Sequence, residues 1–189
     1  MAQEVEIKFR IADVDALTRK LRDSGFQLKT PRTHEMNTLY DLPGQTLRQQ
    51  GALLRIREYG GQWTITYKGK GEAGRHKSRK EIETRVEDGQ SLAGIIEAVG
   101  FQPGFRYEKF RTEWSDGQGH VVVDETPIGN FGEIEGPPEW IDKAASRLGI
   151  TEEEYITDSY AGLFLSWKQQ TGSKANEMTF AAVASAQRQ

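Results

Sequence analysis

The feature that most constrains this sequence is a series of short segments in which charged and apolar residues alternate. In residues 4–11, four charged side chains occupy every second position between four apolar ones: Glu4, Glu6, Lys8 and Arg10 between Val5, Ile7, Phe9 and Ile11. Successive side chains of a β-strand point to opposite faces of the sheet. This segment therefore predicts a strand with one charged and one apolar face. In an ordinary amphipathic strand the charged face lies in water, but here the pattern recurs.

Further segments of the chain are also predicted to be strands, because charged and apolar residues alternate between turn signals. They cover residues 36–41, 52–59, 62–69, 79–86, 106–115, 120–125 and 130–136. In the second of them, Arg55 and Arg57 share one face while Leu54 and Ile56 share the other. The Gly-Gly pair at residues 60–61 is a two-residue hairpin signal. The chain thus supplies about eight amphipathic strands.

Helices are predicted where apolar residues recur at helical spacing after a capping residue. They cover residues 14–24, 91–99 and 138–148, and a fourth begins after Thr151 and carries the aromatic residues up to Trp167. We interpret residues 1–170 as a single domain. The small and polar end of the chain, residues 171–189, is expected to be a flexible tail, in which residues 178–186 add at most one or two weak helical turns.

The composition narrows the class of protein. The chain of 189 residues contains no cysteine, which excludes disulfides, thiolate metal sites and a cysteine nucleophile. Its formal net charge of -3 argues against a general nucleic-acid binder, which is usually basic. No apolar run approaches the roughly 20 residues of a membrane helix, and the N-terminal residues carry no secretory signal. We therefore expect a cytoplasmic protein, a monomer or a homodimer, that binds neither membranes nor nucleic acid.

An internal repeat relates the two halves of the chain. The tripeptide Gly-Phe-Gln at residues 25–27 recurs at residues 100–102, a shift of 75 positions. If differences in loop length shorten the shift to 67, Arg57 of the first half corresponds to Asp124 of the second. One half would then present cations where the other half presents carboxylates.

About eight antiparallel strands can close into a barrel, which removes exposed sheet edges. The helices need an apolar surface to cover, and the apolar strand faces provide it on the outside of such a barrel. We therefore predict an α+β fold, an eight-stranded antiparallel closed β-barrel with a polar interior and helices packed outside. The charged side chains predicted to line this lumen are Glu4, Glu6, Arg55, Arg57, Lys68, Arg79, Glu81, Glu83, Lys109, Arg111, Asp124, Glu133 and Glu135.

A charged lumen of this kind costs several kcal/mol for each ion that is desolvated without a partner. It is tolerable when it is wet, mutually paired, or filled by a ligand of matching charge. Clustered Arg and Lys side chains bind phosphate oxygens, and grouped carboxylates without a cysteine or histidine cluster suit Mg²⁺ or Mn²⁺. The residue types therefore indicate a metal–polyphosphate site, where the chemistry depends mainly on positioning and charge neutralisation.

These residues also resemble a known superfamily. Glu4-x-Glu6-x-Lys8 is similar to the signature of the CYTH, or triphosphate tunnel metalloenzyme, superfamily, whose members include class IV adenylate cyclases, thiamine triphosphatases and inorganic triphosphatases. The resemblance covers residues 3–168 and is strongest to the compact class IV adenylate cyclase-like proteins. Further motifs in family order are Leu54-Arg55-Ile56-Arg57, Thr66-Tyr67-Lys68-Gly69, Arg79-Lys80-Glu81-Ile82-Glu83, Glu108-Lys109-Phe110-Arg111, Val123-Asp124, Gly132-Glu133-Ile134-Glu135-Gly136 and Ser159-Tyr160.

The resemblance implies a tunnel that binds a small-molecule triphosphate together with Mg²⁺ or Mn²⁺. Lys8 would contact phosphate or orient the attacking group, and Glu4 and Glu6 would join it as catalytic residues. Glu81 and Glu83 would support either the metal or the cationic side chains. The implied metal ligands are Glu4, Glu6, Asp124, Glu133 and Glu135. The implied phosphate-binding residues are Arg55, Arg57, Lys68, Arg79, Lys109 and Arg111.

Several functions fit these residues. Attack by a ribose hydroxyl on the α-phosphorus of ATP would give cyclic AMP and pyrophosphate. Attack by water on the terminal phosphorus of tripolyphosphate or thiamine triphosphate would release orthophosphate. A non-catalytic polyphosphate- or nucleotide-binding module and a small-ligand barrel with charges facing solvent are the remaining alternatives. Residues 69–78 lack the Gly-Lys-Ser/Thr ending of a Walker motif, and we interpret them as a flexible basic lip at the tunnel mouth.

Overall fold

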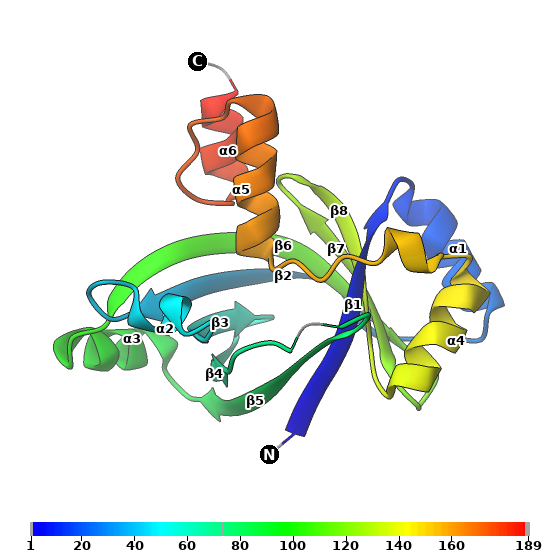
Figure 1. Ribbon diagram of the computed structural model, residues 1–189, viewed down its shortest axis with the longest axis horizontal. Coiled ribbons are helices and arrows are strands. Elements are labelled where there is room, and N and C mark those ends of the chain that lie inside the picture. The colour runs from blue at the N-terminus through cyan, green and yellow to red at the C-terminus, as the bar shows by residue number, and fades with distance from the viewer. Residues whose placement is uncertain (1, 73, 188–189) are drawn as a thin grey trace.

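The computed structural model describes residues 2–72 and 74–187, and a closed antiparallel β-barrel forms its centre (Figure 1). The strands are β1 (Ala2–Ile11), β2 (Gln27–Asp41), β3 (Leu53–Tyr59), β4 (Gln62–Lys68), β5 (Lys77–Val86), β6 (Gln102–Ser115), β7 (His120–Thr126) and β8 (Gly129–Glu135). Around the barrel they follow the order β1-β5-β4-β3-β2-β6-β7-β8. The predicted α+β fold with an eight-stranded closed barrel is therefore confirmed.

Helices cover the outside of the barrel and one of its ends. They are α1 (Val14–Asp23), α2 (Thr46–Gln49), α3 (Gly89–Ala98), α4 (Pro138–Leu148), α5 (Tyr160–Thr171) and α6 (Phe180–Ala186). α4 packs on β1, β8 and α1, and α3 packs on β3 and β4. α5 and α6 stand together at one end of the barrel, next to β2 and β6 (Figure 1). Among the residues that the structure describes, none of the helices has the length and apolar character needed to cross a bilayer.

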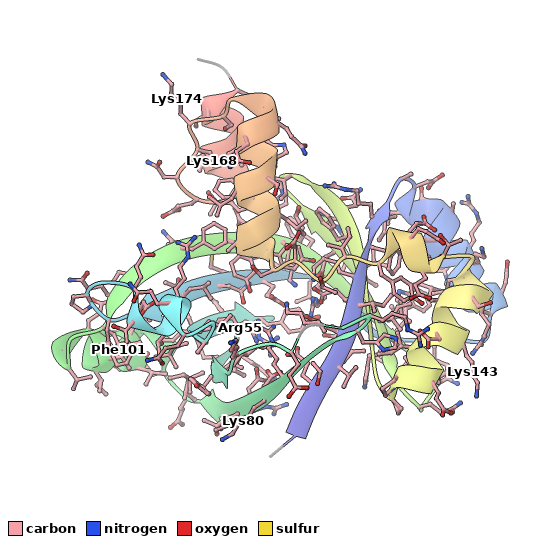
Figure 2. All side chains as sticks on the ribbon, viewed as in Figure 1. Arg55, Lys80, Phe101, Lys143, Lys168 and Lys174 are labelled. Carbon is pink, nitrogen blue, oxygen red and sulfur yellow. The ribbon has the colours of Figure 1, made fainter. Side chains whose placement is uncertain are left out.

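The strands turn their apolar faces outward and their charged faces inward. Ile7 of β1 is fully buried in an outer core together with Leu21 of α1 and Ile141 of α4. Inward-facing Arg55 lies within the barrel, whereas outward-facing Lys80 lies at its periphery (Figure 2). Helix packing thus buries the apolar strand faces, and the charged faces are left to line the lumen.

The strand order has the symmetry that the sequence repeat predicts. β1 pairs with β5 and β2 pairs with β6, and these two junctions lie on opposite sides of the barrel. Exchanging the two halves of the chain reproduces the same closed order. Glu4 lies opposite Arg79 at the first junction, and Glu35 lies opposite Lys109 at the second. A carboxylate therefore faces a cation at each of the two places where the halves meet through corresponding strands.

β2 is longer than the sequence predicts. It begins at Gln27 rather than at Met36, because the intervening residues pair with β6. The pairing shifts register on either side of Thr30, next to Pro31, which has no N–H to give to the ladder. Residues 27–35, which lie before the strand predicted at residues 36–41, are therefore part of β2, and Glu35 lies on the inward face of this strand.

The fourth predicted helix is divided in two. Thr151 caps only a 3₁₀ turn, Glu152–Glu154, and the backbone then becomes extended. Ile156 forms two backbone hydrogen bonds with Lys8 of β1, at 2.7 and 3.1 Å. This extended segment satisfies polar groups at the edge of β1 that β5 does not reach, and α5 begins only at Tyr160.

The end of the chain folds against the barrel, in contrast to the flexible tail that we expected after residue 170. Met178 is fully buried, and its backbone forms hydrogen bonds of 3.0 and 3.1 Å with β6. Ala175 and Val183 are buried in the same cluster. The burial of these three apolar side chains attaches the otherwise polar residues 171–187 to the barrel.

Candidate active site in the barrel lumen

A cavity of about 850 Å³ occupies the barrel interior. Every one of the eight strands contributes to its wall, and Ser159 and Tyr160 contribute from the beginning of α5. Every site residue predicted from the sequence lines this cavity except Asp124, which is fully buried directly behind the wall. The structure therefore brings the predicted cations and carboxylates to one place.

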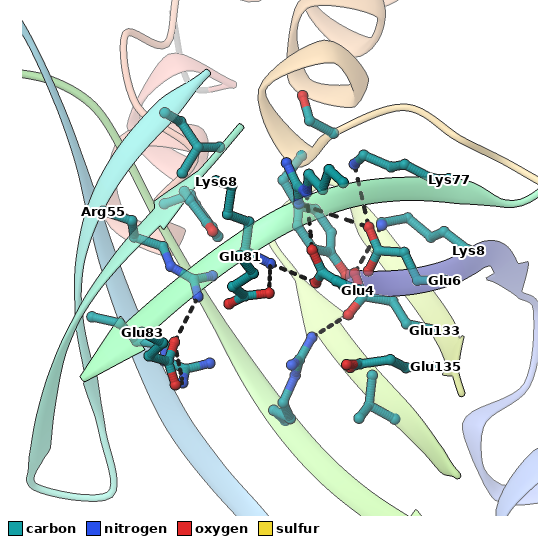
Figure 3. A pocket seen from close by; sticks show the side chains of 18 of the residues that line it. Glu4, Glu6, Lys8, Arg55, Lys68, Lys77, Glu81, Glu83, Glu133 and Glu135 are labelled. Carbon is teal, nitrogen blue, oxygen red and sulfur yellow. Dashed lines mark hydrogen bonds and ion pairs between the residues drawn. The ribbon is translucent and has the colours of Figure 1, made fainter. Parts of the chain in front are cut away.

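Glu4 and Glu6 of β1 are each held by cations from β4 or β5 (Figure 3). Lys68 Nζ lies 2.5 Å from Glu4 Oε1, and Arg79 Nε lies 2.9 Å from Glu4 Oε2. Burial by itself would raise the pKa of Glu4, but Lys68 and Arg79 outweigh it and hold this pKa at about 2. Lys77 Nζ lies 3.2 Å from Glu6 Oε1. Glu4 is thus held in its ionised form, and both carboxylates are paired with cations.

Asp124 of β7 and Glu133 of β8 anchor cations on the other flank of β1. Lys109 Nζ, Arg111 Nε and the Tyr160 hydroxyl donate to Asp124 at 2.8, 2.7 and 2.6 Å. Arg111 also donates to Glu133, whose Oε1 lies 2.8 Å from the Lys8 ammonium. Desolvation opposes the charge on Lys8, but the nearby Glu133 and Glu6 raise its pKa above the ordinary value. In this arrangement Asp124 orients cations with both of its oxygens.

Glu83 performs a similar task for the arginines of β3. Arg57 Nη2 lies 3.1 Å from one Glu83 oxygen, and Arg55 Nη2 lies 3.4 Å from the other. Thr66 donates a 2.6 Å hydrogen bond to the same carboxylate. Glu81 is 3.1 Å from Lys68, and burial together with Glu4 raises its pKa despite that lysine. The structure thus places Glu81 and Glu83 beside the cationic side chains.

Glu135 is a carboxylate in the lumen without a cation of its own. Within the described part of the chain it has no hydrogen-bond or ion-pair partner, and on the barrel wall it lies directly opposite Glu6. Burial raises the pKa of Glu135 to about 7, and the charges of Glu4 and Glu6 act in the same direction. This crowding of like charges would be relieved by a cation between the three glutamates.

The donor atoms at this position are carboxylate oxygens, which are the ligands that Mg²⁺ and Mn²⁺ prefer. The chemical type of these ligand atoms therefore fits such an ion. In residues 2–72 and 74–187, no group of three or more acidic or histidine side chains is already close enough to hold a metal, since Lys68, Lys77 and Arg79 occupy Glu4 and Glu6. A divalent cation would therefore have to replace these ammonium and guanidinium partners.

Comparison with known proteins agrees with this geometry. A family model described as the CYTH domain matches residues 2–160, most of the chain. The chain belongs to the CYTH domain family. Membership explains why the charged residues that line the lumen occur in the same order as the family motifs recognised in the sequence.

Individual relatives of this CYTH domain protein are similar over most of their own length. A candidate adenylate cyclase of Methanocaldococcus jannaschii, MJ0240, is 29% identical over 171 residues, which are 85% of this chain and 97% of the relative. Adenylate cyclase CyaB of Aeromonas hydrophila is 27% identical over 172 residues, 85% of this chain and 87% of CyaB. The structure of HpAC1 from Hippeastrum, a candidate adenylyl cyclase described as revealing a dominant triphosphatase activity, matches with a TM-score of 0.64 at 22% identity, over 86% of this chain and 95% of HpAC1.

The CYTH motifs did not draw attention to Glu35, which the structure places at the centre of the cation cluster. Its carboxylate is fully buried, 3.5 Å from Lys109 and 3.8 Å from Arg111, and it accepts a 2.9 Å hydrogen bond from Asn37. Burial favours its neutral form, but Lys109 and Arg111 outweigh burial and hold the pKa at about 2. The alternation of Glu35 and Asn37 continues the inward face of β2, and a predicted strand that started one residue earlier would have included both.

Lys77 and two residues at the cavity edge were also missed. Lys77 lay in the segment interpreted as a basic lip, but it is the first residue of β5 and pairs with Glu6 across the strands. Burial lowers the pKa of Lys77, although Glu6 opposes this effect. Glu113 and His120 also line the cavity, and both were present in strands that the sequence predicted.

Proposed function

We propose that this CYTH domain protein is a divalent-metal-dependent enzyme that binds ATP in its lumen and converts it into cyclic AMP and pyrophosphate. The observation that carries this proposal is the meeting of two charge sets around a single cavity of about 850 Å³. A binding module for polyphosphate would need the cations alone. The additional, crowded carboxylates of Glu4, Glu6 and Glu135 are what a catalytic metal requires.

The cations would bind the phosphate groups. Arg55, Arg57 and Lys109 are substantially buried and are already oriented by carboxylates. Phosphate oxygens would accept hydrogen bonds from the sides of these cations that face the cavity. Glu83, Glu35 and Asp124 would remain paired with the same cations. Such preorganised donors stabilise charge without reorganising during the reaction. Lys68, Arg79 and Arg111 complete the proposed phosphate-binding set.

Glu4, Glu6 and Glu135 would hold Mg²⁺ or Mn²⁺, with Glu133 at the edge of the site. A bound divalent ion supplies neutralisation of the phosphoryl oxygens and polarises the phosphorus–oxygen bonds. The metal role that the family resemblance implies for Asp124 stays a prediction, because Lys109, Arg111 and Tyr160 occupy its oxygens here. Lys8, placed between Glu133 and Glu6, would orient the attacking oxygen or contact the phosphate that it attacks.

One end of the cavity supports an organic rather than a purely inorganic triphosphate. Leu39, Leu53 and Tyr107 line the cavity, and Leu39 and Tyr107 pack in one cluster with Tyr160 at the beginning of α5. Apolar and aromatic side chains of this kind bind a planar ring better than they bind phosphate. Cyclisation would then need the ribose 3′-hydroxyl to face the α-phosphorus, with pyrophosphate leaving from the opposite side.

Triphosphate hydrolysis is the second candidate function. It is favoured by the likeness to HpAC1, which is described as having a dominant triphosphatase activity. The same cations and carboxylates would serve it, with water attacking the terminal phosphorus of ATP, tripolyphosphate or thiamine triphosphate. The two reactions differ in which phosphorus faces the nucleophile.

Product analysis distinguishes these functions. The purified protein is incubated with ATP, tripolyphosphate or thiamine triphosphate and with Mg²⁺ or Mn²⁺, and the products are separated. Cyclic AMP and pyrophosphate from ATP support the cyclase, and orthophosphate supports the triphosphatase. Tight binding of all three compounds without any product would contradict both and leave a binding module.

A further inference from the structure

Outside the lumen, Asp142 of α4 contacts the side chains of residues that immediately precede β5. We call residues 74–76 the strap. Arg75 forms an ion pair with Asp142, and His76 Nε2 lies 2.8 Å from Asp142 Oδ1. Tyr155 donates a 3.4 Å hydrogen bond to the same oxygen. Two consecutive strap residues are therefore attached to one carboxylate on a helix that itself packs on β1 and β8.

The next residue, Lys77, points the other way. It begins β5, and neighbouring side chains in an extended chain alternate between faces. His76 accordingly lies on α4, and the Lys77 ammonium enters the lumen, 3.2 Å from Glu6 Oε1 (Figure 3). Its side chain is only 14% exposed. The contact with Asp142 thus fixes the backbone at the point where a cation joins the site.

Lys77 lies at the end of the β1–β5 pairing, and the adjacent Ser78 also accepts a 2.8 Å backbone hydrogen bond from Glu72. The last pair in this register is Glu6 with Lys77, and beyond it β1 bonds to Ile156 instead. A terminal residue of a strand frays unless something else attaches it. The strap contacts with Asp142 supply that attachment from the outside of the barrel.

We propose that Lys77 is a further triphosphate-binding residue and that Asp142 is a positioning residue, which sets Lys77 through Arg75 and His76. This inference rests on the proposed function, in which Glu6 binds the metal. Once Glu6 does so, the Lys77 ammonium is released next to the phosphate-binding Arg79, where phosphate oxygens are its available partners. An anchored ammonium loses less entropy on binding than one on a frayed strand end.

A double-mutant cycle tests the coupling between the two sites. Lys77→Gln, Asp142→Asn and the double variant are compared with the wild type, by ATP turnover and by calorimetric titration with tripolyphosphate in Mg²⁺. We expect Lys77→Gln to weaken tripolyphosphate binding and raise KM about tenfold, and Asp142→Asn to do so about threefold with little change in kcat. The double variant should match Lys77→Gln, because without the ammonium there is nothing left to position. Lys77→Arg should recover most of the affinity.

Asp116→Asn is the matched control. Asp116 also pairs with side chains of α4, Trp140 and Arg147, but on the far side from the strap, so the change should leave KM and tripolyphosphate affinity as in the wild type. Additive effects of Lys77→Gln and Asp142→Asn would overturn the positioning role, and unchanged affinity in Lys77→Gln would overturn the binding role. A wild-type protein that binds no tripolyphosphate with Mg²⁺ or Mn²⁺ would overturn the proposed function, and this inference with it.

Discussion

The Tyr160 hydroxyl donates a 2.6 Å hydrogen bond to Asp124, and this bond joins the first residue of α5 to the wall of the lumen. Both residues are buried. The centroid of the Tyr160 ring lies 4.8 Å from the Lys8 ammonium nitrogen and 4.7 Å from that of Lys109. Burial and the charge of Asp124 raise the pKa of Tyr160 well above its ordinary value, so the phenol stays a donor. One residue of the end helix thus contacts both an anion and two cations of the site.

Replacing Tyr160 by Phe tests this connection. The ring and its contacts with Lys8 and Lys109 are kept, but Asp124 loses a buried donor, which should lower the free energy of unfolding by about 1–2 kcal/mol. Turnover should fall several-fold, because Asp124 then orients Lys109 and Arg111 less well. Urea unfolding and steady-state kinetics measure the two effects. A variant with wild-type stability and turnover would show that the hydrogen bond is dispensable.

Glu4→Gln and Glu6→Gln test the metal ligands. An amide keeps the shape of the side chain but loses the charge that binds a divalent ion. Each variant should lose metal-dependent turnover and retain the folded barrel, as judged by circular dichroism. Glu87→Gln is the control, because Glu87 is exposed outside the strands and its replacement should leave turnover unchanged. Full activity in both lumen variants would remove these glutamates from the metal site.

Glu35→Gln tests the buried counter-charge of the cation cluster. Lys109 and Arg111 would remain buried without the negative charge of Glu35 beside them. The free energy of unfolding of the ligand-free protein should therefore fall by about 3 kcal/mol. Tripolyphosphate supplies the missing negative charge and stabilises the folded state by binding to it. It should therefore raise the melting temperature of the variant more than that of the wild type. Equal increases in the two proteins would contradict this role for Glu35.

The crowded Glu135 predicts how stability depends on pH without metal. Its pKa in the folded state is about 7, above the ordinary 4.5, so the folded state binds this proton more tightly than the unfolded state. The free energy of unfolding therefore decreases as the pH rises from the ordinary pKa of 4.5 through the folded-state pKa of about 7. Glu135→Gln should be more stable than the wild type above pH 7, by about 1 kcal/mol after allowance for solvent screening, because the lumen leaves this carboxylate partly accessible to water. The two proteins should be equally stable near pH 4.

Mg²⁺ provides the control for that experiment. If the ion binds beside Glu135, it should raise the melting temperature of the wild type at pH 8 and thereby remove the advantage of the variant. Thermal unfolding between pH 4 and pH 8, with and without Mg²⁺, measures both effects. A constant stability difference across this range would show that Glu135 is not crowded by Glu4 and Glu6.

Much of this architecture could be predicted from the alternation of charged and apolar residues. The pattern in residues 4–11 and its repetition require two chemically different sheet faces, and helices with apolar stripes must cover the apolar one. The inward placement of Arg55 and Lys68 follows from that reasoning. The sequence also indicated which cations and carboxylates would meet, because alternate residues of paired strands share a face.

The residues that escaped prediction lie where tertiary contacts override local signals. Glu35 and Lys77 sit near expected strand ends, and each gains its place because a neighbouring strand extends the pairing across a proline or up to a loop. The break before α5 has a similar cause, since Ile156 pairs with β1 instead of continuing a helix. Met178 is buried by contacts with β6 that a polar stretch of sequence does not reveal.

The central claim is that a triphosphate and a divalent metal bind together inside the barrel. A crystal structure with Mn²⁺ and a non-hydrolysable ATP analogue tests it most directly, because the anomalous signal of manganese locates the ion independently. We predict a manganese peak beside Glu4, Glu6 and Glu135, and phosphates in contact with Arg55, Arg57 and Lys109. An analogue bound outside the lumen, or a manganese peak away from these glutamates, would contradict the account.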